Sequence, residues 1–300
     1  MQNYSLATIS RGGKALSALV VGDQYWSLDK VNEELGLDLP ASNKEILEEW
    51  AKYLPKLDKA FEWAKVQQGD RFADATVLAP ILYPNKVICA GSNYHSHLTE
   101  MTGRSFTREE IGEPYFFLKP PTTTVVGPGK TVILPVDDKN FDWEVELAVV
   151  IGRGGRLIAE ADVYDHIAGY TVSVDLTARG LQMVRKEPLG MNWFTSKGQD
   201  THCPLGPVIT PEHFFPRGEP IGIQLSVNGE LKQDATTADL IFNIPELVSH
   251  ASRFATLEPG DVILTGTPAG VGHAKGTFLK SGDKLDASVP GVGVLSLEVQ

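Results

Sequence analysis

The chain has 300 residues, of which 38 are Asp or Glu and 27 are Lys or Arg, and its formal net charge is −11 at pH 7. This length suggests about two domains, and an acidic balance without a basic run excludes nucleic acid as an expected partner. No apolar run approaches the roughly 18 residues of a membrane span, and the N-terminus lacks the features of a signal peptide, so we expect a cytoplasmic protein with no membrane partner. The two cysteines do not form a disulfide framework, which fits a reducing compartment.

Residues 1–78 are expected to form a small N-terminal accessory domain of α+β type. The first part alternates in strand fashion around glycine turns. Ser42 and Glu45 then form a capping-box pattern, which predicts a helix that ends at Pro55. From residue 79 the strands are short and the turns carry Gly and Pro, so residues 79–300 are expected to form the catalytic domain.

The segment after the strand at 87–90 carries a candidate general base. If a helix begins near residue 94, His97 and Glu100 share one face, and the carboxylate can hold the imidazole in one tautomer. The alternative is a pair of helix-surface residues. Residues 99–113 are polar with glycines near both ends, which favours a mobile lid that is weakly ordered without ligand. Lys119 ends the next apolar strand, where it either contacts an anionic substrate or is a solvated strand end.

Glu144 and Glu146 lie on one face of a strand, about 7 Å apart, because alternate side chains of a strand share a face. The strand continues as an apolar run over residues 147–151. Two carboxylates at this spacing repel by roughly 2 kcal/mol at an effective dielectric of about 20. Protonation, a basic side chain or a bound cation can offset that cost; a solvated strand edge is the structural alternative. Asp175, at the end of another apolar strand, is the candidate third ligand.

Three further segments carry polar side chains towards the same site. Arg179 and Gln182 follow Asp175 at the i+4 and i+7 positions of an expected helical turn. Lys197 follows a buried aromatic segment, and a lysine beside carboxylates stays charged and can stabilise an enolate; the alternative is a surface lysine. The glycine-rich turn at 265–272 offers backbone N–H groups and a Thr hydroxyl to a carboxylate. It lacks the P-loop lysine and the dinucleotide fingerprint, which excludes nucleotide binding.

The order of these segments over residues 80–300 resembles the fumarylacetoacetate hydrolase family. Each segment alone is a modest signal, and together they are highly specific. The matching segments are Gly-Ser-Asn-Tyr-His-Ser-His-Leu-Thr-Glu (91–100), Phe-Phe-Leu-Lys-Pro (116–120), Asp-Trp-Glu-Val-Glu-Leu-Ala-Val-Val-Ile-Gly (142–152), Asp-Leu-Thr-Ala-Arg-Gly-Leu-Gln (175–182), Lys-Gly-Gln-Asp-Thr-His-Cys-Pro-Leu-Gly-Pro (197–207) and Thr-Gly-Thr-Pro-Ala-Gly-Val-Gly (265–272).

The resemblance implies a β-rich α+β fold, a mixed β-sandwich roll, and a homodimer. It also implies a divalent cation, Mg²⁺ or Mn²⁺, held by Glu144, Glu146 and Asp175. The roles that it implies for other side chains are water activation by His97 with Glu100, orientation of that water by Gln182, a place beside the metal for Lys197, and substrate contacts by Arg179, Lys119 and Thr267.

Members of the family typically act on small 2-oxo acids, including acylpyruvates. The resemblance therefore predicts a metal-dependent hydrolase that cleaves a C–C bond of a 2,4-dioxo acid to pyruvate and a carboxylic acid. Decarboxylation of an oxaloacetate-like acid is the second hypothesis, followed by isomerase or dehydratase chemistry and by a catalytically silent homologue. The sequence departs from the family pattern at His95, where a small residue is expected, and in a longer segment between His97 and Lys119. Both departures fall near the expected lid.

Overall fold

The computed structural model describes residues 3–182 and 190–300, and it contains a large sheet and a smaller sheet that face each other. The large sheet has twelve strands. Its main path runs in the order β4 (Asp70–Arg71), β3 (Gln24–Ser27), β2 (Lys14–Val21), β1 (Ser5–Arg11), β14 (Cys203–Pro211), β12 (Ile167–Val174), β11 (Val145–Ile151), β17 (Val262–Leu264), β6 (Val87–Gly91) and β7 (Tyr115–Lys119). Off this path, β5 (Thr76–Leu78) pairs with β1 and β8 (Val125–Val126) pairs with β14.

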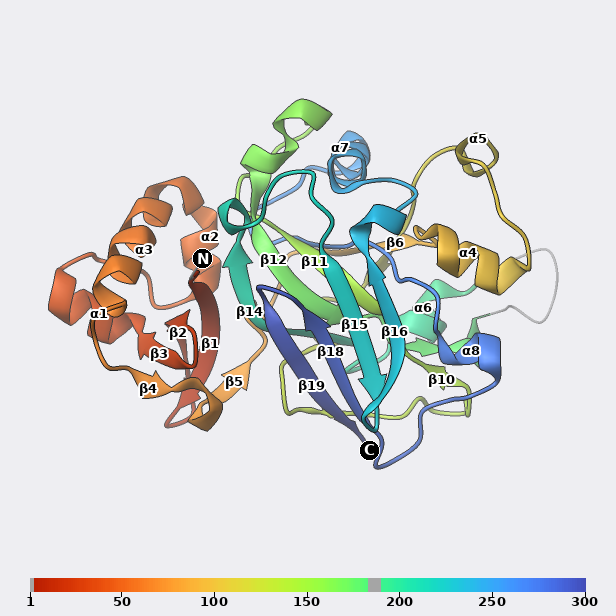
Figure 1. The fold of residues 1–300 in the computed structure, drawn as a ribbon, viewed down its shortest axis with the longest axis horizontal. Helices are drawn as coiled ribbons and strands as arrows, with labels where there is room; N and C mark the ends of the chain where they lie inside the picture. The colour runs from red at the N-terminus through yellow and green to blue at the C-terminus, as the bar shows by residue number, and fades with distance from the viewer. Residues whose placement is uncertain (1–2, 183–189) are drawn as a thin grey trace.

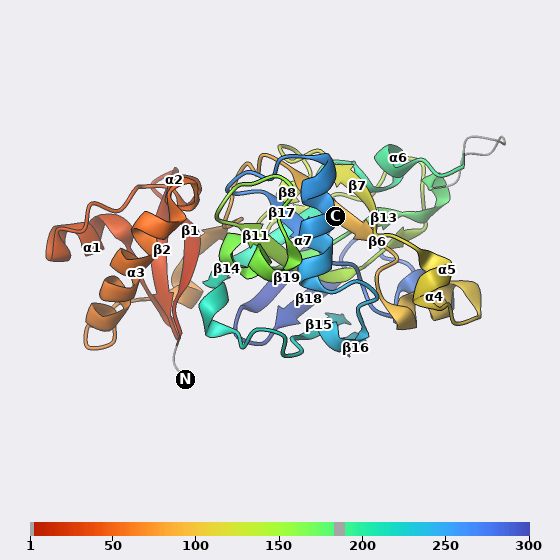
Figure 2. The same ribbon diagram turned by 90° about the horizontal axis from the view of Figure 1, so that it is seen from above.

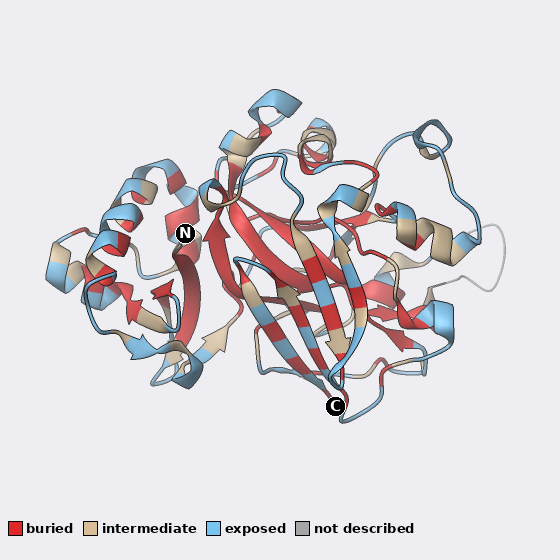
Figure 3. Cartoon of the chain, viewed as in Figure 1, coloured by how far each residue is buried: buried red, intermediate tan, exposed pale blue. Residues whose placement is uncertain are grey.

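The smaller sheet covers the middle of the large one (Figure 1). Its five strands follow the order β16 (Glu230–Thr236), β15 (Gly222–Val227), β18 (Lys284–Val289), β19 (Gly293–Val299) and β9 (Thr131–Val132). β11 packs against β15, β12 against β18 and β14 against β19. Strands β18 and β19 of the smaller sheet alternate between buried and exposed residues. Strands β11 and β12 of the large sheet are buried along their whole length (Figure 3). This strand-rich α+β arrangement confirms the predicted fold class.

The register of β11 and β12 brings the three predicted ligands together. The two strands are antiparallel, with Val145 opposite Val174 and Glu146 opposite Ser173. The start of β11 therefore lies beside the end of β12, where Asp175 follows. Both strands consist of apolar and β-branched residues, which suits strands that are covered on both faces.

The N-terminal part extends the large sheet to one side (Figures 1 and 2). Its helices are α1 (Leu28–Leu35), α2 (Asn43–Glu48) and α3 (Trp50–Ala64), and α1 and α3 pack against β2. Strand β1 pairs with β14 through Leu6 and Ile209, so the sheet is continuous from the N-terminal part into the rest of the chain. The domain boundary after residue 78 stays a prediction.

In place of one helix that ends at Pro55, the structure contains the two helices α2 and α3. Ser42 caps α2 as predicted and accepts a hydrogen bond from the Glu45 backbone N–H. The break comes at Glu49, and α3 continues through Pro55 to Ala64. Pro55 removes one backbone donor, but buried side chains on both sides of it, among them Tyr53 and Leu57, hold the helix against the sheet. The expected stop at Pro55 was wrong because tertiary packing outweighs this local signal.

The remaining described chain contains further helices, most of them short. They are α4 (His95–Thr102), α5 (Arg108–Ile111), α6 (Trp193–Lys197), α7 (Ile244–Phe254) and α8 (Gly272–Lys275), and a two-stranded ladder joins β10 (Phe141–Asp142) to β13 (Thr177–Ala178). Short 3₁₀ helices lie at Phe72–Asp74, Glu160–His166, Arg179–Leu181, Glu212–Phe214 and Thr237–Asp239.

The expected lid at 99–113 contains the end of α4 and all of α5. Arg108 of α5 forms an ion pair with Glu246 of α7, which ties the segment to the body of the protein. The mobility of the lid stays a prediction. Within residues 3–182 and 190–300, no helix has both the length and the apolar character needed to cross a membrane.

Candidate active site

A cavity of about 350 Å³ opens at the end of β11 and β12 that carries the predicted ligands. Its wall is built from β6, α4, β7, the 3₁₀ turn after β13, α6 and the turn after β17. Eight of the ten side chains that the sequence singles out line it: His97, Glu144, Glu146, Asp175, Arg179, Gln182, Lys197 and Thr267. The remainder of the wall is largely apolar and includes Leu98, Met101, Tyr115, Phe117, Met191 and Trp193.

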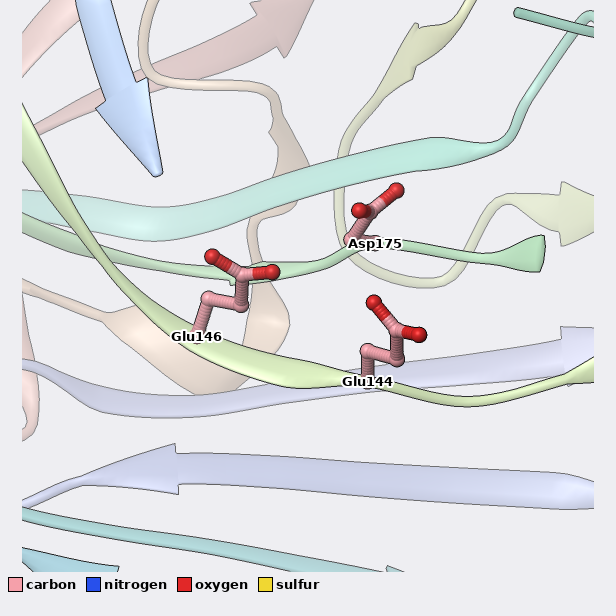
Figure 4. A group of neighbouring side chains, drawn as sticks. All are labelled: Glu144, Glu146 and Asp175. Carbon is pink, nitrogen blue, oxygen red and sulfur yellow. The ribbon is translucent and has the colours of Figure 1, made fainter. Parts of the chain in front are cut away.

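Glu144, Glu146 and Asp175 form a buried carboxylate triad. One oxygen from each side chain lies within 4.8 Å of the others, and no residue of the triad is more than 5% exposed. Figure 4 shows Glu144 and Glu146 projecting from the same side of one strand, with Asp175 at the end of the neighbouring strand beside them. The backbone locks this arrangement, because the Asp175 N–H donates to the Glu144 carbonyl at 2.8 Å.

Lys197 bridges two members of the triad. Its Nζ lies 2.7 Å from Glu144 Oε2 and 2.5 Å from Asp175 Oδ2, and it also donates to the Thr177 hydroxyl at 2.8 Å. Burial alone would lower the pKa of Lys197, but Asp175 and Glu144 outweigh burial and raise it. Lys197 is therefore a fixed positive charge at the cavity wall, as the sequence predicts, and not a surface lysine.

Arg179 forms an ion pair with the second carboxylate oxygen of Glu144. Its Nη2 donates to Glu144 Oε1 at 2.5 Å, and its Nε donates to Asp142 Oδ2 at 2.8 Å. Burial would raise the pKa of Glu144, but Lys197 and Arg179 keep it well below its usual range. Glu144 is thus an ionised carboxylate with two cationic partners.

Glu146 has no such partner. In the described parts of the chain, no Lys, Arg or His nitrogen forms an ion pair with it, and its Oε2 accepts a hydrogen bond from the Gly266 backbone N–H. Burial, Asp175 and Glu144 together raise the pKa of Glu146 well above its usual range. A divalent cation fits this observation, because three hard carboxylate oxygens converge and one of them lacks a compensating charge.

Lys119 corrects an expectation of the sequence. It was expected to line the substrate pocket, but its side chain has no exposed surface and does not belong to the cavity wall. Its Nζ lies 2.5 Å from Asp175 Oδ1 and donates to the carbonyls of Leu176 at 3.2 Å and His202 at 2.6 Å. Lys119 therefore contacts Asp175 from outside the cavity.

His97 and Glu100 are not joined by a hydrogen bond in this structure. His97 is 6% exposed, and burial lowers its pKa to about 4, with Glu144 opposing that shift and Arg179 and Lys197 adding to it. Its Nδ1 has no hydrogen-bond partner in the described part of the chain. Glu100 Oε2 instead accepts from the Gly270 N–H at 2.9 Å. The water-activating dyad stays a prediction.

Two residues of the site were missed by the sequence reasoning. Asp142 is fully buried, and besides Arg179 it accepts hydrogen bonds from the backbone N–H groups of Trp143, Gly272 and His273. Its position directly before the glutamate strand was the available signal. Gln233 of β16 contacts the Thr267 hydroxyl, and nothing in its local sequence marks it.

Comparisons with known proteins identify the family of the chain. The family model described as fumarylacetoacetate (FAA) hydrolase C-terminal matches residues 86–300. An oxaloacetate tautomerase of Bacillus subtilis (strain 168) is 39% identical over 271 residues, which is 87% of each chain. A mitochondrial oxaloacetate tautomerase of Bos taurus is 41% identical over 225 residues, which is 74% of this chain and 69% of the relative.

The fold is also similar to that of solved structures. A maleylpyruvate hydrolase from Sphingobium sp. SYK-6 in complex with manganese(II) and pyruvate has a TM-score of 0.77 and 29% identity, and the match covers 100% of this chain and 98% of that one. A fumarylpyruvate hydrolase from Pseudomonas aeruginosa in complex with Mn²⁺ and pyruvate has a TM-score of 0.64 and 35% identity, covering 72% of this chain and 89% of that one. The chain belongs to the fumarylacetoacetate hydrolase family.

Proposed function

We propose that this protein is a divalent-metal-dependent enzyme that interconverts the keto and enol forms of a 2-oxo dicarboxylic acid of the oxaloacetate type. The observation that carries the proposal is the buried triad with one uncompensated carboxylate, Glu146, beside the fixed positive charge of Lys197. The names of the relatives at 39% and 41% identity support this reaction over others of the family.

The cation would be held by Glu144, Glu146 and Asp175. When bound, Mg²⁺ or Mn²⁺ would supply Lewis acidity that polarises a 2-oxo group and favours its enolate. Two solved relatives contain Mn²⁺ and pyruvate, which supports this choice of metal and of a 2-oxo acid ligand. The choice between magnesium and manganese is left to the experiment.

The side chains around the triad then have distinct tasks. Lys197 adds positive charge where the enolate develops. His97, neutral at pH 7 because its pKa is about 4, accepts the proton that leaves C3, and the return of one proton to the 2-oxygen completes the enol. The apolar wall beside them excludes water, which strengthens each of these electrostatic contacts.

Hydrolysis of the C–C bond of a 2,4-dioxo acid is the second candidate. The two pyruvate-containing neighbours are named as maleylpyruvate and fumarylpyruvate hydrolases, and this favours it. The reaction needs an activated water, however, and Glu100 is engaged with Gly270 instead of His97. Decarboxylation of oxaloacetate, which needs enolate stabilisation but no attacking water, remains an alternative on the same substrate.

A single panel separates these reactions. Oxaloacetate enol is mixed with the protein and MgCl₂ or MnCl₂, and loss of the enol absorbance, release of CO₂ and cleavage of acylpyruvates are followed in parallel. We expect the enol absorbance to decay faster than in buffer with the metal alone, and His97→Gln to slow it by about 100-fold or more. Enol decay at the background rate together with rapid acylpyruvate cleavage would establish the hydrolase in place of the tautomerase.

The assembly and the location of the protein are further proposals. We infer a homodimer, as the family resemblance implies, which light scattering of the purified chain checks. Several relatives are named as mitochondrial, and the cytoplasmic location expected from the sequence stays a prediction.

A further inference from the structure

The amide of Gln233 has only one orientation that satisfies its neighbours. The side chain is 1% exposed, and its Oε1 lies 2.9 Å from the backbone nitrogen of Val145, the residue between Glu144 and Glu146. A backbone N–H can only donate, so the amide oxygen must face it. The amide nitrogen therefore faces the opposite side, towards the turn after β17.

Both hydrogens of that nitrogen have acceptors. Gln233 Nε2 donates to the Thr267 hydroxyl at 2.8 Å and to the Pro268 carbonyl at 2.9 Å. The carbonyl can only accept, which agrees with the orientation set by Val145. The Thr267 oxygen is thus an acceptor towards Gln233, and its own hydrogen must be directed elsewhere.

That hydrogen has no protein acceptor within residues 3–182 and 190–300. Thr267 is 3% exposed, and its exposed part faces the cavity that contains the carboxylate triad. The turn that carries it is also fixed in place, because the Gly266 N–H donates to Glu146 and the Trp143 indole donates to the Gly270 carbonyl at 3.1 Å. Thr267 therefore presents a donor to the cavity from a rigid support.

We propose that Gln233 is a positioning residue that makes Thr267 an obligatory hydrogen-bond donor, so that the ligand group seated at Thr267 is an acceptor, a carboxylate or carbonyl oxygen. This inference rests on the proposed function, since it describes how a 2-oxo acid is oriented at the same site. Gln233 acts through Thr267 and contacts no ligand itself.

A double-mutant cycle tests the coupling. Oxalate binding is measured by titration calorimetry in the presence of MnCl₂ for wild type, Gln233→Met, Thr267→Val and the double variant, and Mn²⁺ binding without oxalate is measured for each. We expect each single change to weaken oxalate binding by about tenfold, the size of one hydrogen bond to a charged group. The double variant should bind oxalate no more weakly than Thr267→Val, and the affinity for Mn²⁺ should change by less than about twofold in all of them.

Two control variants keep the test decisive. Thr267→Ser retains the hydroxyl and should bind oxalate like wild type. If Gln233→Met does not fold, Gln233→Glu replaces it, because the new side chain keeps an acceptor for the Val145 N–H and removes the fixed donor to Thr267. We expect the same loss of oxalate affinity in this variant and no further loss when Thr267→Val is added.

Additive effects in the cycle, or Thr267→Ser binding oxalate as weakly as Thr267→Val, would overturn the positioning role of Gln233. A parallel loss of Mn²⁺ and oxalate affinity in Gln233→Met would also overturn it, since that result describes a structural role. A wild-type protein that binds Mn²⁺ but not oxalate would contradict the proposed function itself, and the role of Gln233 would fall with it.

Discussion

Lys119 is a buried cation that contacts a carboxylate of the triad but does not line the cavity. It contacts Asp175 and two backbone carbonyls, and its side chain has no exposed surface. We expect Lys119→Met to lower the free energy of unfolding by about 3–5 kcal/mol, because it leaves the buried Asp175 without one of its two cations. Urea denaturation measures this change.

The control for this substitution is Lys52→Met, because Lys52 pairs with Glu49 on the surface, where both side chains are more than half exposed. It should change the stability little. A Lys119→Met protein as stable as wild type, with a weakened affinity for substrate alone, would return Lys119 to the substrate pocket.

A second prediction for a single residue concerns the protonation of His202 and its effect on stability. Burial lowers its pKa to about 3, with Lys119 adding to the shift and the Ile133 carbonyl and Asp200 opposing it. The unfolded chain therefore binds a proton near pH 6.5 that the folded chain binds only near pH 3, so stability is lost as the pH falls through this window. Each such group contributes a slope of up to about 1.4 kcal/mol per pH unit.

Unfolding free energies of wild type and His202→Gln between pH 4.5 and 7.5 measure that slope. We expect the variant to be less stable at pH 7.5, since the imidazole packs on Phe141 at a ring distance of 4.7 Å, but to lose less stability on acidification. Parallel curves for the two proteins would show that His202 does not titrate in this way.

At the scale of one element, the turn between β17 and α8 depends on Gly270. Its φ is +106°, and a Cβ there would lie 2.1 Å from the Lys232 carbonyl of β16. The close approach is what brings Thr267 within reach of Gln233. We expect Gly270→Ala to lower the unfolding free energy by at least about 2 kcal/mol and to weaken oxalate binding with it.

Gly229 provides the matched control for this turn. It also has a positive φ, +80°, but no atom lies within 4 Å of the Cβ position. Gly229→Ala should therefore cost only the backbone strain, about 1 kcal/mol, and leave oxalate binding unchanged. Equal effects of the two substitutions would mean that the packing of the turn against β16 is unimportant.

At the scale of the whole molecule, the carboxylate triad and the strands β6, β7, β11 and β12 could be predicted from the sequence. The reason is that their signals are local: Glu144 and Glu146 obey the strand period, and Asp175 ends an apolar run.

The other parts of the site depend on contacts between distant segments. Lys119 reads as a strand end because its partners Leu176 and His202 lie 57 and 83 positions further along the chain. Gln233 lies 88 positions from Val145. Such contacts follow from the register of two sheets, which no local pattern contains.

The balance of charges around the carboxylate triad provides the most direct test of the proposed metal site. Among the residues that the structure describes, Asp142, Glu144 and Asp175 form ion pairs with Lys119, Arg179 and Lys197, whereas Glu146 forms none. Glu146→Gln keeps an acceptor for the Gly266 N–H and removes the uncompensated charge. The metal-free variant should therefore be at least as stable as metal-free wild type.

The decisive measurement is titration calorimetry of MnCl₂ into wild type and Glu146→Gln, with the thermal unfolding of both followed at each metal concentration. We expect wild type to bind one Mn²⁺ per chain, with an unfolding temperature that rises with the metal concentration. The variant should lose at least about tenfold in affinity, or 1.4 kcal/mol. A wild-type protein that does not bind Mn²⁺, or a variant that binds it equally well, would contradict the assignment of the carboxylate triad as a metal site.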